Sequence, residues 1–524
     1  MVTFWGNYEG ISQGYVVFKG LSRKNKAALF FGAPEAEAES LPTSRVSLFD
    51  VYEDHHDLFN ELSNEKFIVI GRKGCGKSAF AEYAYTLSKN NANLFCSFIR
   101  QDTVNMETLV QLGTKESGDK QSKEHLFKWL IYTHILKMFF ENEAIEHGQD
   151  LKLLKEFLKK NSGYIDIDKG EILELIKKHK FEVSIEQFKR FFKGKYGQDI
   201  QIKESRAPYY KLLPHLETVV ASVLASEGNI ENENSYVVFF DDLDIGFSAN
   251  DSESVDTIVN LLRTAKYVNN NVFAKNNVSA KAIILIRDDV ERLLAPLEAD
   301  VAKIFSSYST SLDWYQEEYL QQDREDELGL KKLIEKRAKN ALNKAGVEQD
   351  KDSAWESLVE ECFHPKSSFK YICDHTFLRP RDLILFFKPL ETGRYNLPLD
   401  KRNVNSLLGQ YSSELVKELS NELSSFYDKI QIQNIFDSLK EINNKYNCTY
   451  KHAKYIINST CKDVNAEALL EDLFSRSFIA SVDKSNDFVR FKHKTSKKDA
   501  GEYELDKHGY IIIHSGLKVY LRNR

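Results

Sequence analysis

The stretch Gly71-Arg72-Lys73-Gly74-Cys75-Gly76-Lys77-Ser78 matches the phosphate-loop pattern G-x-x-x-x-G-K-[ST] at every fixed position. It follows the apolar run Lys66–Ile70, which predicts a buried strand, and leads into Ser78–Leu87, which predicts a helix with a wide apolar face. Glycines let the backbone N–H groups of such a loop face one point, where the helix N-terminus adds partial positive charge. The order strand, glycine loop, helix therefore predicts a site for the phosphates of a nucleotide.

Two side chains of the loop have different expected roles. Lys77 should reach the outer phosphates, and the Ser78 hydroxyl should ligate Mg²⁺, so ATP and Mg²⁺ are the cofactors that we expect. The residues expected to bind the nucleotide are Gly71, Arg72, Lys73, Gly74, Cys75, Gly76, Lys77, Ser78 and Ala79.

A second run of sequence predicts the catalytic acid. Ser235–Phe240 is a continuous β-branched and aromatic run, typical of a central parallel strand buried on both faces, and it ends in Asp241-Asp242-Leu243-Asp244. Acidic residues at the carboxyl end of such a strand emerge in the ligand crevice of an α/β sheet. One aspartate there can hold Mg²⁺ and its neighbour can orient or deprotonate a water. The alternative is a strand that stops at a solvated acidic turn.

Two further segments place arginines near this site. The apolar run Ala282–Ile286 predicts another buried strand, and the Arg287 that follows it would reach the γ-phosphate side, or else form a salt bridge with Asp288 or Asp289. Val255–Val268, before that strand, predicts a helix with Arg263 on one face.

A proline marks the start of a later helix. In Phe377–Ile384, Pro380 and Asp382 form an N-terminal signature that presents Arg379 and Arg381 together at the helix mouth. Such a pair suits a phosphate sensor. A pair of arginines on a solvated helix end is the alternative.

Composition limits the class of protein. The chain has 524 residues, enough for two to four domains, and a net charge of −6, so contact with DNA would need a local basic patch. Six cysteines without metal or disulfide spacing predict the reducing cytoplasm. No apolar run approaches the roughly 18 residues of a membrane helix, so no membrane partner is expected.

The chain is predicted to have four parts. Residues 1–62 form an N-terminal adaptor segment, in which 27–31 resembles a strand and 47–62 a helix. Residues 63–310 form the core, with a helical insertion at about 104–230; residues 311–400 form a helical lid; residues 401–524 form a helical region ending in a winged helix. The loop of that last unit is basic and could meet a DNA backbone. Its basic residues are Arg490, Lys492, Lys494, Lys497 and Lys498.

With these motifs in this order, the chain resembles the AAA+-related ATPases of the STAND and KAP type, and most of all bacterial P-loop ATPases found with phage-defence genes. The glycine-rich loop carries the resemblance together with Phe240–Asp244, Ile286–Asp289 and Arg379–Asp382, and the tail Ile513–Leu517 resembles the end of the family's winged helix. The resemblance covers about residues 60–390 and the tail.

The resemblance implies a fold: an α/β P-loop NTPase core of the additional-strand type with a parallel sheet of order 5-1-4-3-2, a large α-helical insertion, a helical lid and a C-terminal winged helix. It also implies roles. Lys77, Ser78 and Asp241 would bind ATP–Mg²⁺, Asp242 would polarise the attacking water, and Arg287 with Arg379 or Arg381 would sense the γ-phosphate. Asp242 stands where the family usually has a glutamate, which is one methylene longer, so slow, switch-like hydrolysis is expected.

The function expected on these grounds is a cytoplasmic ATPase switch that forms homo-oligomers on binding ATP and regulates an effector protein, such as a nuclease or toxin encoded nearby, in antiphage defence. The first alternative is a DNA-engaging loader or motor that uses residues 490–498. A kinase with a separate acceptor site and a scaffold that holds the nucleotide as a structural ligand are the other two.

Overall fold

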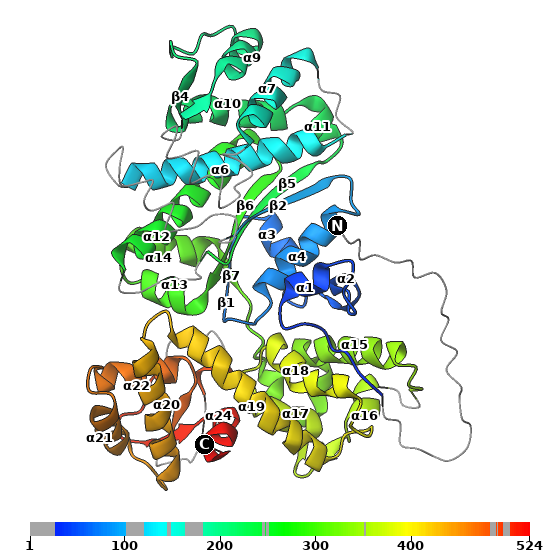
Figure 1. Ribbon diagram of the computed structural model, residues 1–524, viewed down its shortest axis with the longest axis vertical. Helices are drawn as coiled ribbons and strands as arrows, with labels where there is room; N and C mark the ends of the chain where they lie inside the picture. The colour runs from blue at the N-terminus through cyan, green and yellow to red at the C-terminus, as the bar shows by residue number, and fades with distance from the viewer. Residues whose placement is uncertain are drawn as a thin grey trace, which may run out of the picture.

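The computed structural model describes residues 27–100, 120–143, 148–162, 182–243, 247, 251–349, 353–482, 489, 491–495 and 503–523. Figure 1 shows a central sheet with helices on both sides, a further group of helices beyond one end of the strands, and a predominantly helical half that holds the C-terminus. The fold is mixed α/β.

The sheet has five parallel strands in the order β2-β5-β6-β1-β7. The strands are β1 (Ile68–Gly71), β2 (Leu94–Arg100), β5 (Ser235–Asp241), β6 (Ala280–Arg287) and β7 (Ser309–Ser311). Numbered along the chain and read from β7, this order is 5-1-4-3-2, so the predicted strand order is confirmed. The strand with the acidic end, β5, lies between β2 and β6 and thus inside the sheet, as its unbroken apolar run predicts.

Alternate residues of the strands face two separate hydrophobic cores. Helix α4 (Lys77–Ser88) covers one face, and α6 (Lys120–Glu141) and α12 (Ser252–Tyr267) pack on the other, with α10 (Leu213–Leu224) packed against α6 (Figure 1). The first face contributes Val69, Phe239, Ile283 and Leu285, and the second contributes Ile68, Ile70, Val238, Phe240, Ile284 and Ile286. Burial on both faces fixes the register of the strands and hence where their carboxyl ends lie.

Between β2 and β5 the described residues are mainly helical. They include α6, α10 and a short antiparallel pair of strands, β3 (Glu182–Ser184) with β4 (Arg206–Pro208). The other helices of this interval are α7 (Gln149–Lys160), α9 (Glu186–Tyr196) and α11 (Glu227–Glu231). Residues 104–119 and 163–181 of the predicted insertion lie outside the described residues.

The segment before β1 differs from its prediction in two places. Residues 27–31 bury Leu29 and Phe31 but join no sheet among the described residues; Leu29 N instead donates to Leu390 O at 3.2 Å. Residues 47–62 form two short helices, not one. These are α2 (Leu48–Val51) and α3 (Leu58–Ser63), and α1 (Ala36–Ser40) precedes them.

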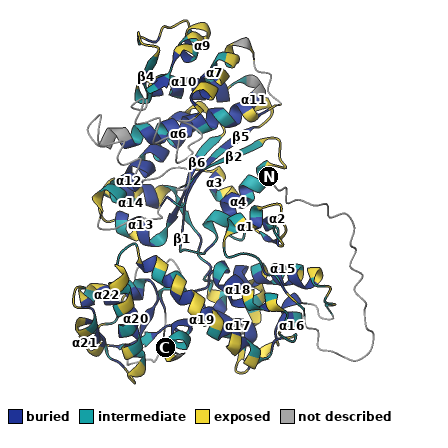
Figure 2. Cartoon of the chain, viewed as in Figure 1, coloured by how far each residue is buried: buried dark blue, intermediate teal, exposed yellow. Residues whose placement is uncertain are grey.

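After β6 come α13 (Asp288–Leu294) and α14 (Ala299–Tyr308), and the chain beyond β7 is mostly helical. Its helices are α15 (Gly329–Lys344), α16 (Ala354–Leu358), α17 (Ser368–Cys373), α18 (Pro380–Phe387), α19 (Lys401–Leu423), α20 (Lys429–Asn444), α21 (Tyr450–Thr460), α22 (Ala466–Ser475) and α24 (Ser515–Asn523). The antiparallel strands β10 (Ile479–Val482) and β11 (Tyr510–Ile513) lie before α24, which packs against α19. Figure 2 shows how thoroughly α18 is enclosed: Arg381 is its one residue that is not buried.

Candidate functional site

The carboxyl ends of β1, β5 and β6 open into a pocket of about 800 Å³. The glycine-rich loop forms one wall, and Asp241, Asp242 and Arg287 line the pocket from the strand ends. The N-terminal segment around α1 and α2 closes a second side, and α18 and α19 close a third. The structure therefore brings together, around one pocket, the loop, the acidic strand end and an arginine that lie far apart in the sequence.

The shape of the loop depends on its glycines at two positions. Gly76, which precedes α4, has a φ of +105°, in the left-handed region that side chains rarely adopt. A Cβ on Gly71 would lie 2.3 Å from Cys75 Sγ, so any other residue there would require the Cys75 side chain to move. The first-turn N–H groups of α4, from Gly76 to Ala79, lack intrahelical partners and belong to residues that line the pocket.

Carbonyl groups of the loop accept hydrogen bonds from residues that line the pocket. Trp314 Nε1 donates to Cys75 O at 2.8 Å, and Arg381 N donates to Gly74 O at 3.3 Å. Lys77 Nζ donates to Gly71 O at 2.8 Å and to Arg72 O at 3.3 Å. These bonds hold the loop open, with its ammonium group on the concave side.

Ser78 and Asp241 meet across the pocket. Ser78 Oγ donates to Asp241 Oδ1 at 3.1 Å, which links the start of α4 to the end of β5. The same oxygen accepts a hydrogen bond from Asp242 N at 3.1 Å. Burial raises the pKa of Asp241 to about 7; the Asp242 carboxylate adds to that increase, whereas Arg100 and the bond from Ser78 oppose it.

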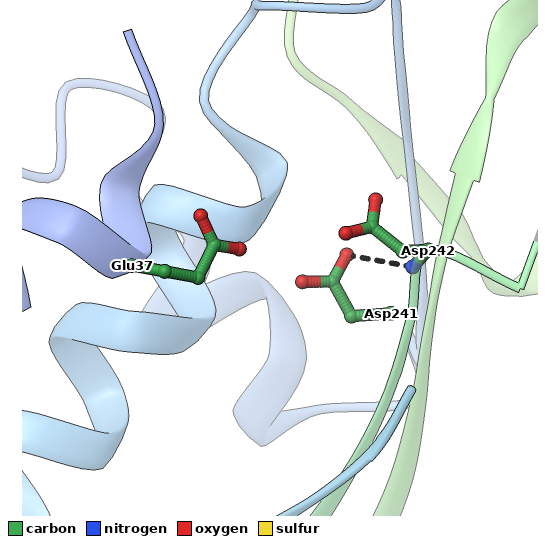
Figure 3. A group of neighbouring side chains, drawn as sticks. All are labelled: Glu37, Asp241 and Asp242. Carbon is green, nitrogen blue, oxygen red and sulfur yellow. Dashed lines mark hydrogen bonds between the residues drawn. The ribbon is translucent and has the colours of Figure 1, made fainter. Parts of the chain in front are cut away.

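Asp242 itself lies on the pocket wall in a left-handed conformation, with a φ of +56°. Aspartate tolerates this region better than most residues, but the conformation is uncommon and turns the side chain away from the line of β5. Figure 3 shows the two aspartate side chains diverging from the strand end, with a third carboxylate opposite.

That third carboxylate is Glu37 of α1, a residue that the sequence analysis did not single out. One oxygen from each of Glu37, Asp241 and Asp242 lies within 4.8 Å of the others. Arg100, at the end of β2, completes the group: its guanidinium lies 3.9 Å from Glu37 and 3.7 Å from Asp241, and it bonds Glu82 at 2.5 Å. Arg100 could have been found as the polar residue that follows the largely apolar run Leu94–Ile99, whereas Glu37 had no comparable signal.

Arg287 lines the pocket from the end of β6 and is held there by several contacts. It forms an ion pair with Asp289, one of the two partners that the alternative interpretation named, and donates to Ser425 Oγ at 3.4 Å. Asp289 also accepts from Arg476 at 3.1 Å. Arg263, by contrast, pairs with Glu298 and Asp300 and is not among the pocket residues.

The two arginines at the start of α18 are placed differently, although only one residue separates them. Arg379 is 2% exposed, and its guanidinium bonds Asp382 at 2.8 Å, Glu422 at 2.6 Å and Lys73 O at 3.0 Å. Arg381 lines the pocket, donates to Pro34 O at 2.9 Å and pairs with Glu418 at 3.1 Å. In this conformation Arg379 supports the loop from behind, and Arg381 faces the pocket.

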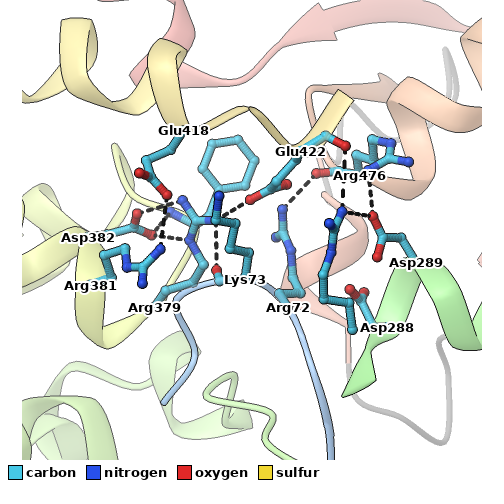
Figure 4. A network of polar contacts seen from close by, with 12 residues as sticks. Arg72, Lys73, Asp288, Asp289, Arg379, Arg381, Asp382, Glu418, Glu422 and Arg476 are labelled. Atoms are coloured by element: carbon cyan, nitrogen blue, oxygen red, sulfur yellow. Dashed lines mark hydrogen bonds and ion pairs between the residues drawn. The ribbon is translucent and has the colours of Figure 1, made fainter. Parts of the chain in front are cut away.

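A network of charges joins the back of the loop to the C-terminal half (Figure 4). Arg72 Nη2 donates to Arg476 O at 3.0 Å, and Arg476 in turn pairs with Asp472 and Asp289. We call this group the loop–helix joint. Its members are Arg72, Lys73, Arg287, Asp289, Arg379, Asp382, Glu422, Asp472 and Arg476.

The basic residues proposed to meet DNA are only partly described. Lys492 Nζ donates to Tyr503 O at 2.7 Å, and Lys494 Nζ pairs with Asp374 at 2.7 Å, so both ammonium groups are engaged within the protein. Arg490, Lys497 and Lys498 lie outside the described residues.

Comparison with known proteins adds a regional match. Residues 328–420, from the start of α15 into α19, match the family model of the FunZ-associated C-terminal helical domain. The matched region includes Arg379, Arg381 and Glu418, so it contributes both to the pocket and to the loop–helix joint.

A longer, weaker similarity extends over most of the chain. The sequence is 21% identical over 474 residues to the putative transposon gamma-delta 80.3 kDa protein of Escherichia coli (strain K12), covering 86% of this chain. The chain spans 62% of the length of that relative. Within the part of the chain that the structure describes, no helix combines the length and apolar character needed to cross a membrane.

Proposed function

We propose that this chain is a P-loop ATPase of the additional-strand class that binds ATP–Mg²⁺ in the 800 Å³ pocket and hydrolyses it slowly, as a switch. One observation carries the proposal. The glycine-rich loop and the acidic strand end meet at the same pocket, with Ser78 Oγ 3.1 Å from Asp241 Oδ1. In this reading β10, β11 and the helices around them form the predicted winged helix.

The loop would hold the phosphates. The first-turn N–H groups of α4 and the Lys77 ammonium lie on the concave side, where they can bind phosphate oxygens in place of water. Lys77 would exchange its bonds to Gly71 O and Arg72 O for bonds to the outer phosphates.

The residues at the end of β5 fit Mg²⁺. A hydroxyl and a carboxylate are the hard oxygen donors that this ion prefers, and the buried Asp241 Oδ2 accepts no hydrogen bond among the described residues. Ser78 and Asp241 would hold the ion, directly or through water. There the ion would supply positive charge to offset the negative charge that develops on the phosphate oxygens.

Asp242 would position and polarise the water that attacks the γ-phosphorus, so that the bond to the β-phosphate breaks and ADP and phosphate are released. Its side chain is one methylene shorter than a glutamate, which supports slow turnover. Arg287 and Arg381 line the same pocket and are the arginines best placed to contact the γ-phosphate.

The proposed switch depends on the helices of the C-terminal half that line the pocket. Arg381 belongs to α18, and the loop–helix joint connects the loop to α19 and α22. A γ-phosphate bound at Arg381 would therefore shift the position of the C-terminal half. Homo-oligomerisation, a regulated effector and a role in antiphage defence are the parts of the proposal that the family resemblance supports. The transposon name belongs to the relative; it is compatible with a mobile-element setting for this chain.

Lys77→Ala tests the proposal. Binding of a fluorescent ATP analogue to the full chain should fall by about a hundredfold or more, since the ammonium makes charge-assisted bonds with phosphates. Lys89→Ala, at the exposed C-terminal end of the same helix, is the matched control and should bind as the wild type does. Equal affinity of Lys77→Ala and the wild type would refute the proposed site.

A further inference from the structure

We propose that Glu37, carried into the pocket by the N-terminal segment, is a third acidic ligand of the divalent cation, and that Glu37, Asp241 and Asp242 can bind that cation before any nucleotide arrives. The identity of the cation as Mg²⁺ rests on the proposed function. The grouping of the three side chains does not, because it is a property of the structure: one oxygen from each lies within 4.8 Å of the others (Figure 3).

Among the described residues, the charges around this point do not balance. The guanidinium of Arg100 forms ion pairs with three carboxylates, those of Glu37, Glu82 and Asp241, and the carboxylate of Asp242 adjoins two of these. Arg100 lies against Glu82 at 2.5 Å and stands off from Asp241 at 3.7 Å and from Glu37 at 3.9 Å. The guanidinium therefore neutralises Glu82 first and leaves the other three carboxylates with an excess of negative charge.

One oxygen in the group also lacks a hydrogen bond. Asp241 is 1% exposed, and its Oδ2 accepts no hydrogen bond among the described residues, although its Oδ1 accepts two. The nearest cation among the described residues, Arg100 Nε, lies 3.7 Å from this Oδ2, beyond hydrogen-bonding distance, and a buried carboxylate oxygen in this state is costly unless a metal ion or another donor comes closer. The Ser78 hydroxyl adjoins the same carboxylate, so the point is surrounded by the oxygen donors that Mg²⁺ and Mn²⁺ prefer.

Glu37 is held in place by its neighbour in α1. Glu39, two residues further on, is 2% exposed and forms a two-point ion pair with Arg337 of α15, at 2.7 and 2.8 Å. Arg337 also donates to Phe31 O at 2.7 Å, and Glu39 accepts from Ala33 N at 2.8 Å. Both ends of the segment that leads into α1 are thus fixed to α15, which presents Glu37 to the strand end. Cation binding would consequently depend on how the N-terminal segment sits on α15.

The test measures cation binding to the nucleotide-free full chain by Mn²⁺ electron paramagnetic resonance. The wild type should bind Mn²⁺, and Glu37→Gln should bind it at least about tenfold more weakly, since it keeps the size of the side chain and removes one charged ligand. Glu441→Gln is the matched control: it removes the same charge from an exposed position on α20, outside the residues that line the pocket, and should bind Mn²⁺ as the wild type does. Equal Mn²⁺ affinity of Glu37→Gln and the wild type, or no Mn²⁺ binding to the wild type without nucleotide, would overturn the inference.

A second measurement separates this inference from the proposed function. Binding of the fluorescent ATP analogue in the presence of EDTA should be the same for Glu37→Gln and the wild type, which also shows that the variant is folded. Lys77→Ala should show the opposite pattern, with nucleotide binding lost and Mn²⁺ binding kept. If Lys77→Ala binds nucleotide normally while Glu37→Gln loses Mn²⁺, the cation site stands and the nucleotide site is wrong.

Discussion

The two sides of the glycine-rich loop are built on different principles. On the pocket side, carboxylates outnumber the nearby guanidinium of Arg100, and a buried oxygen of Asp241 accepts no hydrogen bond among the described residues. On the other side, in the loop–helix joint, Arg379 and Arg476 each bond two carboxylates at hydrogen-bonding distance. A site with unbalanced charge is arranged for a ligand to complete, whereas a paired one is arranged to hold two parts of the chain together.

This contrast separates residues that sequence patterns group together. Arg72 and Lys77 belong to one motif, yet Arg72 points into the joint, where it also stacks over Phe377 with 4.9 Å to the ring centre, and Lys77 lines the pocket. Changes on the pocket side should therefore alter ligand binding and turnover with little loss of stability. Changes in the joint should lower stability with little effect on ligand binding, except at Lys73 and Arg287, which also line the pocket.

The largest effect is expected on the pocket side, for Asp242→Asn. Asparagine also tolerates the left-handed conformation at φ +56°, so the backbone should be preserved while the ability to polarise water is lost. ATP turnover, measured as phosphate release, should fall by about a hundredfold to ten-thousandfold. Affinity for the ATP analogue and the free energy of unfolding should stay close to wild type; unchanged turnover would assign the catalytic role to another residue.

The next largest effect is expected in the joint, for Arg379→Ala. Removing this guanidinium leaves the buried Asp382 and the largely buried Glu422 without their common partner and removes the bond to Lys73 O. Breaking a buried pair in this way costs about 3–5 kcal/mol, which urea unfolding would measure. Arg394→Ala, at an exposed position after α18, should change the free energy of unfolding by less than about 0.5 kcal/mol. Similar stabilities of the two variants would show that the joint carries little energy.

How far the sequence predicts this molecule depends on how local each signal is. The strands β1, β5 and β6 and the start of α18 were predictable because apolar runs, glycines and a proline encode them within a few residues. Their carboxyl ends meet in one pocket because parallel strands share a direction, so Ser78 and Asp241 could be paired in advance despite lying 163 residues apart.

The rest depends on contacts that no local pattern encodes. Arg379 and Arg381 have the same residue type and nearly the same sequence context. Their different positions depend on α19, where Glu422 pairs with the buried Arg379 and Glu418 pairs with Arg381 at the pocket. Glu37 lies in an acidic connection with no periodicity, and Arg337 of α15 determines where its segment sits. Residues 27–31 have the composition of a strand, but they pair with no strand among the described residues, and Leu29 N instead donates to Leu390 O.

A smaller effect is expected from pH, at the contact between the joint and the C-terminal strands. His514 is fully buried, and both ring nitrogens of His493 are buried without hydrogen bonds among the described residues; the two rings lie 5.3 Å apart beside Phe377. Burial lowers the pKa of each well below its usual range, and the nearby positive charges of Lys494 and Arg72 lower both further.

Because both histidines bind a proton more readily in the unfolded chain, their contribution to stability is complete above the unfolded pKa of about 6.5 and is lost as the pH falls below it. When the pH falls from 7.5 to 5.5, protonation of the two histidines in the unfolded chain should lower the free energy of unfolding by about 2–3 kcal/mol. His493→Phe should remove about half of this loss, as measured by urea unfolding at the two pH values. An identical pH dependence in the variant and the wild type would place the titrating groups elsewhere.

The smallest loss of stability is expected for Arg381→Ala, which is the sharpest test of the contrast because Arg379 lies two residues away. Its pair with Glu418 is partly exposed on both sides, at 19% and 24%, so unfolding free energy should fall by less than about 1 kcal/mol. Affinity for ATP should nevertheless fall by about tenfold, with affinity for ADP nearly unchanged, if Arg381 contacts the γ-phosphate. Equal losses for ATP and ADP would place Arg381 at another part of the nucleotide and leave Arg287 as the arginine that senses the γ-phosphate.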